Sequence, residues 1–150
     1  MSEQNRQVLD VDVLFVGAGS ASLAGALHLK KLADNAGLDI SIAIIEKARE
    51  IGAHSLSGAI IDPRALNELI PDYLEKDIPF EAEVTEEHMY YLTSNGKMQF
   101  PYLPKSISHH GCYVASIGQF TRWLGKICEN KGIDIFCGFS GSELIYENKK

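Results

Sequence analysis

Apolar runs and helical spacing alternate over residues 11–46 in a way that predicts a strand, a helix and a second strand. The runs 11–16 (VDVLFV) and 40–46 (ISIAIIE) are rich in β-branched residues and are typical of parallel strands buried on both faces. Between them, small and apolar residues recur on one side of a helix expected from residue 19 to about residue 33. A right-handed β-α-β connection places the ends of both strands side by side.

The middle of the chain predicts a short helix and a hairpin. Asp62 is the expected N-cap of the helix, Pro63 its first residue and Pro71 its stop, with Leu66, Leu69 and Ile70 on one apolar side. The segments HMYYLT and KMQF flank SNG between residues 88 and 100, which is typical of a β-hairpin.

The last third of the chain predicts another helix and two strands. Ser116 and Gln119 have capping-box spacing at the start of a helix that is expected to end at Gly132. Its apolar positions recur at helical spacing, so Phe120 and Trp123 are interpreted as core residues. The segments IDIFCG (133–138) and SELIYE (142–147) then read as strands.

Charge and cysteine usage exclude several classes of function. The 14 basic and 20 acidic residues give a net charge of −6, and no basic run interleaves with aromatic residues, so no nucleic-acid partner is expected. The three cysteines lie apart, at Cys112, Cys128 and Cys137, which argues against a disulfide framework, a zinc site or an iron-sulfur cluster in this chain. The N-terminus predicts no signal or transit peptide, so a bacterial protein that starts in the cytosol is expected.

The segment VGAGSASLAGA (16–26) is close to the glycine turn that binds dinucleotides. In that turn the first glycine permits the tight bend, the second lets backbone amides approach a pyrophosphate, and the third serves helix-strand packing. Gly17 and Gly19 keep the first two functions, whereas Ser22 replaces the third glycine. The turn alone leaves NAD, FAD and an ordinary turn without a ligand as alternatives.

Glu46 ends the second strand, where an acidic side chain accepts hydrogen bonds from an adenosine ribose and repels a 2′-phosphate. This position disfavours NADP, although a solvated glutamate at a strand end is the ordinary alternative. Residues 46–63 (EKAREIGAHSLSGAIIDP) place flexible backbone beyond the carboxyl end of the sheet, where ligands of α/β proteins bind. No nucleophile with a base and no metal spacing is present, and His54, His109 and His110 are expected to be structural or exposed.

Four stretches together resemble the electron-transfer flavoprotein-ubiquinone oxidoreductase family: DVLFVGAGSASLAGALHLKKL, IIEKAREIGAHSLSGAIIDPRALNELIPDY, VTEEHMYYLT and HHGCYVASIGQFTRWLGKICENKGIDIFCGF. The resemblance implies an α/β, Rossmann-like FAD/NAD(P)-binding fold of the three-layer, glutathione-reductase-like kind, incomplete in this chain. It implies FAD as the cofactor and these cofactor-binding residues: Gly17, Ala18, Gly19, Glu46, Lys47, Gly52, Ser57 and Gly58. Residues 8–58 would form the dinucleotide unit, 59–110 a helix and hairpin insert, and 111–150 the return to the FAD domain.

The family's reaction takes electrons from reduced electron-transfer flavoprotein through FAD and a four-iron four-sulfur cluster to ubiquinone. Its members are several times longer, so the resemblance implies an N-terminal fragment that lacks the cluster and quinone parts, retains little flavin and is inactive alone. It also implies a peripheral position on the cytoplasmic side of the inner membrane. The alternatives are a geranylgeranyl-reductase-like enzyme, a quinone-reducing flavoprotein of nitrogen fixation, or a non-catalytic Rossmann-like fragment.

Membrane contact in this family would begin near the segment IIDPRALNELIPDYL (60–74). The apolar side of the helix expected at residues 62–70 can lie in a membrane interface. The same side can equally pack into the core of this protein, and the sequence leaves both interpretations open.

Overall fold

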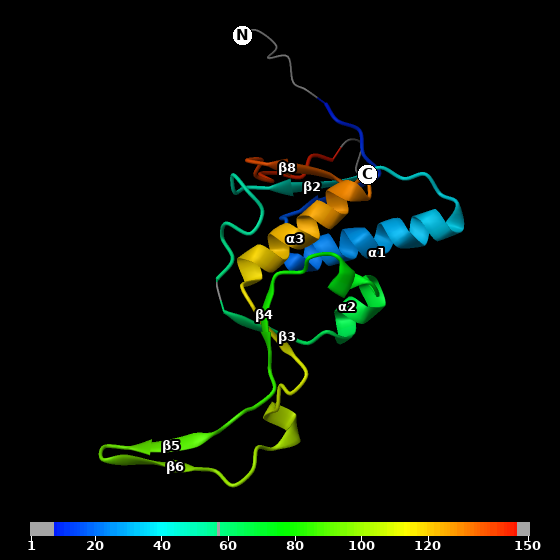
Figure 1. Ribbon diagram of the computed structural model, residues 1–150. Helices are drawn as coiled ribbons and strands as arrows, with labels where there is room; N and C mark the ends of the chain where they lie inside the picture. Colours follow the sequence, from blue (N-terminus) through cyan, green and yellow to red (C-terminus); the bar gives the residue numbers. More distant parts are fainter. Residues whose placement is uncertain (1–7, 57, 147–150) are drawn as a thin grey trace. The chain divides into compact units, whose positions relative to one another are not determined.

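The computed structural model describes residues 8–56 and 58–146, and these form two compact units (Figure 1). The first unit comprises the chain up to residue 55 together with the chain from residue 121 onward, and the second comprises residues 56–120. The second unit is therefore inserted in the sequence between two parts of the first.

A parallel three-stranded sheet is the centre of the first unit. Strands β1 (Val13–Val16), β2 (Ile42–Glu46) and β8 (Asp134–Cys137) lie in the order β1-β2-β8. The helices α1 (Ser20–Ala36) and α3 (Ile117–Asn130) lie on the same side of this sheet (Figure 1). The predicted β-α-β unit is confirmed, as are the α3 helix and the strand that follows it.

The core of the first unit lies between the sheet and its two helices. Ile42, Ala43 and Ile44 of β2 are buried, as predicted for this strand. The prediction that β1 is also buried on both faces is wrong, because Leu14 and Val16 are 50% and 64% exposed. Strand β1 lies at the edge of the described sheet, and both helices cover the opposite face from these side chains.

Helix α1 packs closely on β1 at Gly25. A Cβ atom added there would lie 3.3 Å from the ring of Phe15, so an alanine at this position would require the ring to move by a few tenths of an ångström. Ser22 is half-buried on the same helix. Farther along, the thiol of the fully buried Cys128 on α3 lies 3.6 Å from the carbonyl oxygen of Leu23. Burial raises the pKa of the Cys128 thiol to about 12, so this cysteine is inert at neutral pH.

The second unit contains an antiparallel sheet and a short helix. Strands β3 (Ala59–Ile61), β7 (Tyr113–Ala115) and β4 (Phe80–Glu83) lie in the order β3-β7-β4, with an irregular register in β4. The rings of Phe80 and Tyr113 stack at 4.2 Å, and Tyr73 meets Phe80 edge-on at 6.0 Å. The helical elements of this unit are α2 (Arg64–Leu69) and the 3₁₀ turns η1 (Tyr73–Glu75) and η2 (Lys105–Ile107).

Helix α2 begins one residue later than predicted. Its N-cap is Pro63, and Asp62 instead accepts a hydrogen bond of 3.0 Å from the backbone N–H of Arg64 while pairing with the Arg64 guanidinium. Asp62 therefore still accepts an amide at the start of the helix, although it lies one residue before the N-cap. Leu66 and Ile70 on the apolar side of this helix are buried.

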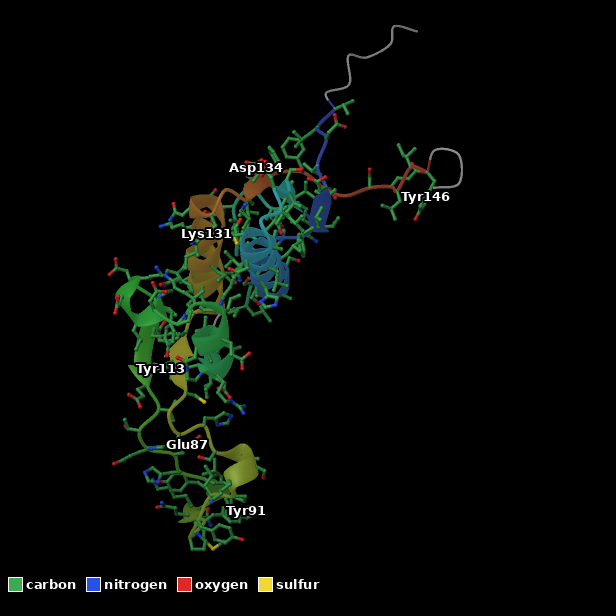
Figure 2. All side chains as sticks on the ribbon, turned by 90° about the vertical axis from the view of Figure 1, so that its right-hand side faces the viewer. Glu87, Tyr91, Tyr113, Lys131, Asp134 and Tyr146 are labelled. Carbon is green, nitrogen blue, oxygen red and sulfur yellow. The ribbon has the colours of Figure 1, made fainter. Side chains whose placement is uncertain are left out.

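A separate hairpin projects from the rest of the second unit (Figure 1). Its strands β5 (Tyr90–Thr93) and β6 (Gly96–Gln99) confirm the predicted hairpin around SNG. The Glu87 carboxylate ties the base of the hairpin to a neighbouring loop, because it accepts hydrogen bonds of 2.8 Å from the Ser108 hydroxyl and the His109 backbone N–H and lies 2.9 Å from His109 Nδ1. Figure 2 shows Glu87 near this base and Tyr91, a residue of β5, below it in that view.

The predicted strand in SELIYE is wrong for the residues that the structure describes, which end at Tyr146. After β8 the chain turns at Gly138, whose φ is +83°, and residues 139–146 form no regular element (Figure 2). Gly141 lies against β1, since a Cβ atom there would be 3.0 Å from Val16. A strand needs a hydrogen-bonded neighbour, and the described residues provide none for this segment.

Candidate functional site

The turn between β1 and α1 requires glycine at its first position. Gly17 has a φ of +98°, which side-chain-bearing residues rarely adopt, and its N–H donates a hydrogen bond of 2.7 Å to the carbonyl of Ile45. This bond holds the end of β1 against the end of β2. The predicted role of Gly17 in the tight bend agrees with this geometry.

Gly19 is different, because nothing within the described chain requires a glycine there. It is the N-cap of α1 with φ −76° and ψ 166°, and a Cβ atom would meet nothing within 4 Å. The first helical bond runs from Leu23 N–H to Gly19, so the preceding amides have no acceptor in the helix, and no side chain caps it among the described residues. This open, uncapped helix N-terminus fits an anion.

The predicted convergence of the glycine turn and Glu46 is confirmed. One carboxylate oxygen of Glu46 accepts a hydrogen bond of 2.8 Å from the Ala18 N–H, and the other accepts one of 2.8 Å from the Ala48 N–H. The pKa of Glu46 is lowered chiefly by the Ala48 hydrogen bond, with smaller contributions from Ala18 and from the charges of His54 and Lys47, while burial acts in the opposite direction. Glu46 is therefore ionised at neutral pH.

A shallow, open depression adjoins Glu46. The described residues that line it belong to the loop after β2: Lys47, Ala48, Arg49, Glu50, Ala53 and His54. The loop offers cationic groups beside an ionised carboxylate, and it lies at the carboxyl end of the parallel sheet, where α/β proteins bind ligands.

The remaining residues predicted for cofactor binding lie in different places. Gly52 is in the turn that follows, with φ +76°, and its carbonyl accepts a hydrogen bond from the Ser55 N–H. Gly58 belongs to the second unit and has φ +84°. Ser57 lies outside the described residues. The structure thus brings together Gly17, Ala18, Gly19, Glu46 and Lys47.

The predicted exposure of the three histidines is confirmed, and one of them has an unexpected partner. His54, His109 and His110 are exposed, but His109 is held by Glu87 in the second unit.

The roles of Ala48, Gly138 and Phe139 at the site were not predicted from the sequence. Their backbone groups fix the site. The Gly138 N–H donates a hydrogen bond of 2.8 Å to the backbone carbonyl of Ala48, and the Phe139 N–H donates one of 2.9 Å to the backbone carbonyl of Glu46. No side-chain signal could reveal these backbone contacts.

The described residues include neither a cluster of metal ligands nor a membrane-spanning helix. No group of three or more metal-ligating side chains lies together in the part of the chain that the structure covers. No helix within residues 8–56 and 58–146 has the length and apolar character needed to cross a membrane.

Comparison with known proteins relates this turn and carboxylate to one family of flavoproteins. No protein-family profile matches the chain. The electron transfer flavoprotein-ubiquinone oxidoreductase of Dictyostelium discoideum is 42% identical over 137 residues, which cover 91% of this chain. The Pseudomonas aeruginosa enzyme is 43% identical over 95% of the chain. Over more than nine tenths of its length, the chain is therefore similar to proteins named electron transfer flavoprotein-ubiquinone oxidoreductase. The resemblance predicted from the sequence motifs is confirmed.

The chain spans about a quarter of the length of these electron transfer flavoprotein-ubiquinone oxidoreductases, since the match covers 22% of the Dictyostelium protein and 27% of the Pseudomonas protein. Among solved structures, a geranylgeranyl bacteriochlorophyll reductase-like protein from Thermoplasma acidophilum superposes with a TM-score of 0.61 at 21% identity, over 92% of this chain and 32% of that one. CtdE, solved in complex with FAD, gives 0.52 at 16% identity, over 87% of this chain and 30% of that one. These likenesses confirm the predicted Rossmann-like α/β fold.

Proposed function

We propose that the chain forms the part of an FAD site that binds the ADP half of the cofactor, in an oxidoreductase that takes electrons from reduced electron-transfer flavoprotein and reduces ubiquinone. The observation that carries this proposal is the open N-terminus of α1 beside the Glu46 carboxylate. The names of the relatives support the partners, and the FAD complex of CtdE supports the cofactor.

The residues of the turn fit a pyrophosphate. The free amides at the start of α1 offer hydrogen-bond donors, and the helix dipole adds partial positive charge. Because Gly19 has no side chain and its Cβ position is empty, a phosphate can approach the backbone directly. Ala18 contributes its backbone N–H to Glu46, so it orients the carboxylate at the edge of the turn.

Glu46 and Lys47 fit the adenosine end. Each oxygen of the Glu46 carboxylate accepts one backbone N–H and keeps a lone pair for a ribose hydroxyl. The same negative charge repels a 2′-phosphate, which favours FAD over NADP. Lys47 lines the adjoining depression. The roles of Gly52, Ser57 and Gly58 near the flavin rest on the family resemblance alone.

FAD would supply the redox chemistry, and the residues of this chain bind and orient it. No catalytic residue is assigned here. We assign the four-iron four-sulfur cluster and the quinone site of the family's reaction to the parts of the relatives that this chain does not match. The likeness to a geranylgeranyl-reductase-like protein concerns the fold alone and does not favour that alternative.

Nucleotide titrations of the purified chain test this proposal. ADP and FAD are expected to bind with similar, weak affinity, because the described site contacts only their shared half, and FMN is expected to bind at least about tenfold more weakly. Adenosine 2′,5′-bisphosphate is expected to bind more weakly than ADP because of Glu46. Isothermal titration calorimetry measures all four. The proposal is wrong if ADP does not bind, or if FMN binds as well as ADP.

We further propose that the inserted hairpin, rather than helix α2, meets the membrane surface. The apolar side of α2 is buried at Leu66 and Ile70, which leaves little of it for lipid. By contrast, Leu92 and Tyr102 in and beside the hairpin are 72% and 75% exposed, and Tyr91 and Met98 are also exposed. An isolated two-stranded hairpin is marginally stable in water, and aromatic side chains favour membrane interfaces.

Leu92→Asp is expected to reduce binding to phosphatidylglycerol vesicles about tenfold or more, because it replaces an apolar contact with lipid by a charge. Vesicle flotation measures the bound fraction. Leu74→Asp is the matched control, since Leu74 is 63% exposed and lies outside the hairpin. Equal flotation of Leu92→Asp and the wild-type chain would contradict membrane contact by the hairpin.

A further inference from the structure

The loop of residues 47–55 supplies the described lining of the depression beside Glu46. It contains no helix or strand, and most of its side chains are exposed. Its conformation therefore depends on contacts with the rest of the first unit. Two of its residues, Ala48 and Ile51, make contacts with elements that follow much later in the sequence.

Ile51 is held against helix α3 by its side chain and its carbonyl oxygen. Its Cδ1 lies so close to Gly125 that a Cβ atom there would be 2.5 Å away, so the missing side chain forms the notch that receives it. Its carbonyl oxygen accepts a hydrogen bond of 3.2 Å from Arg122 Nε, one turn earlier on α3. These contacts bring the middle of the loop onto the helix.

Strand β8 holds the same loop from the other direction. The Gly138 N–H donates to the Ala48 carbonyl at 2.8 Å. Burial raises the pKa of the Cys137 thiol, while a hydrogen bond with the backbone of Ile51 lowers it, so the thiol also contacts the loop. Ala48 is thus held by the residue that follows β8, and Ile51 is held by α3. The two contacts restrict the positions of Arg49 and Glu50 between them.

The glycine in the notch is unfavourable for the helix itself. Gly125 is a buried interior residue of α3, where glycine costs about 1 kcal/mol relative to alanine. The close seating of Ile51 is a contact that a side chain at position 125 would displace.

We propose that Gly125 and Arg122 are positioning residues of the nucleotide site, which hold Ile51 and thereby set the affinity for the adenosine half of the ligand. This inference rests on the proposed function, because it assigns the depression to adenosine. Neither residue touches the ligand. Both act through the loop, which places Lys47 and Ala48 beside Glu46.

The notch is tested with Gly125→Ala, alone and combined with Ile51→Val, in the full chain. The single variant is expected to weaken ADP binding about fivefold and to speed amide hydrogen exchange in residues 48–55. Ile51→Val removes Cδ1, and the next atoms of Ile51 lie 3.6 Å or more from the new Cβ, so the double variant is expected to regain wild-type affinity and protection. A structural loss unrelated to this contact would not be rescued by shortening Ile51.

Arg122 is tested in the same way, with a control on the same helix. Arg122→Ala is expected to weaken ADP binding about fivefold and to expose the loop to exchange, whereas Lys126→Ala, at an exposed position of α3, is expected to change neither. Unchanged exchange and affinity in both Gly125→Ala and Arg122→Ala would overturn the inference. If the wild-type chain does not bind ADP, the proposed function fails, and the exchange rates alone then decide whether α3 holds the loop.

Discussion

Gly19→Thr is expected to reduce ADP and FAD binding at least about a hundredfold while leaving the free energy of unfolding within about 0.5 kcal/mol of the wild-type value. Threonine and glycine are similarly favourable at an N-cap, and the extended backbone of Gly19 suits either residue. The space around its Cβ is empty in the protein, so the branched side chain is accommodated there. The same side chain would occupy the approach of a phosphate to the start of α1.

Gly17→Thr is the matched comparison, because it places the same side chain two residues earlier. The φ of +98° at Gly17 is strained for a β-branched residue, so this variant is expected to lose about 1–3 kcal/mol of stability. Urea unfolding measures the stability of both variants, and ADP titration measures their affinity. Together the two measurements show which glycine the fold requires and which one the ligand requires. If Gly19→Thr binds ADP as the wild-type chain does, then no phosphate approaches Gly19 and the proposed site is wrong.

Glu46→Gln is expected to destabilise the chain by about 2 kcal/mol at pH 7 and to weaken ADP binding. The carboxylate accepts backbone N–H bonds from Ala18 and Ala48, and hydrogen bonds to a charged group contribute about 1.5–3 kcal/mol each. Glutamine keeps one acceptor oxygen, but its amide nitrogen would face the other N–H donor. Glu143→Gln is a control at an exposed position of the same unit that does not line the depression.

The contribution of Glu46 to stability should also depend on pH. Its pKa in the folded chain is lowered, first by the hydrogen bond from Ala48, so folding favours the ionised form. The stabilisation is fully present above the unfolded pKa of about 4.3 and is lost as the pH falls through the lower folded pKa. The difference in unfolding free energy between the wild-type chain and Glu46→Gln should therefore shrink on acidification from pH 6. A difference that stays constant would contradict an ionised Glu46 in the fold.

The β-α-β unit and the meeting of the glycine turn with Glu46 could be predicted from the sequence. Hydrophobic spacing determines the elements, and the handedness of parallel connections brings the two strand ends together. The hairpin around SNG and the end of α3 near Gly132 were predictable for a similar reason, because turn residues mark them. Each of these features follows from a pattern of residues within one continuous stretch of the chain.

The features that could not be predicted depend on neighbours that sequence patterns do not specify. Leu14 and Val16 belong to a run typical of a buried strand, yet they are exposed because they lie on the face of the sheet opposite the helices, whereas Phe15 contacts Gly25 of α1. The run after Ser142 has the composition of a strand but no strand beside it. The seat of Ile51 on Gly125 joins residues far apart in the sequence, and a glycine inside a helix carries no indication of the side chain that fills its notch.

The position of the second unit in the sequence also affects how the first unit can form. Strand β8 cannot pair with β2 until the chain from Lys47 to Ile133 has been synthesised and its ends have been brought together. Closing so long a loop has an entropic cost, and contacts between distant residues slow folding. Prior folding of residues 56–120 would shorten the flexible part of that loop to its two connections. The aromatic stack of Tyr73, Phe80 and Tyr113 would then influence the rate at which the nucleotide site is completed, although it contributes no residue to that site.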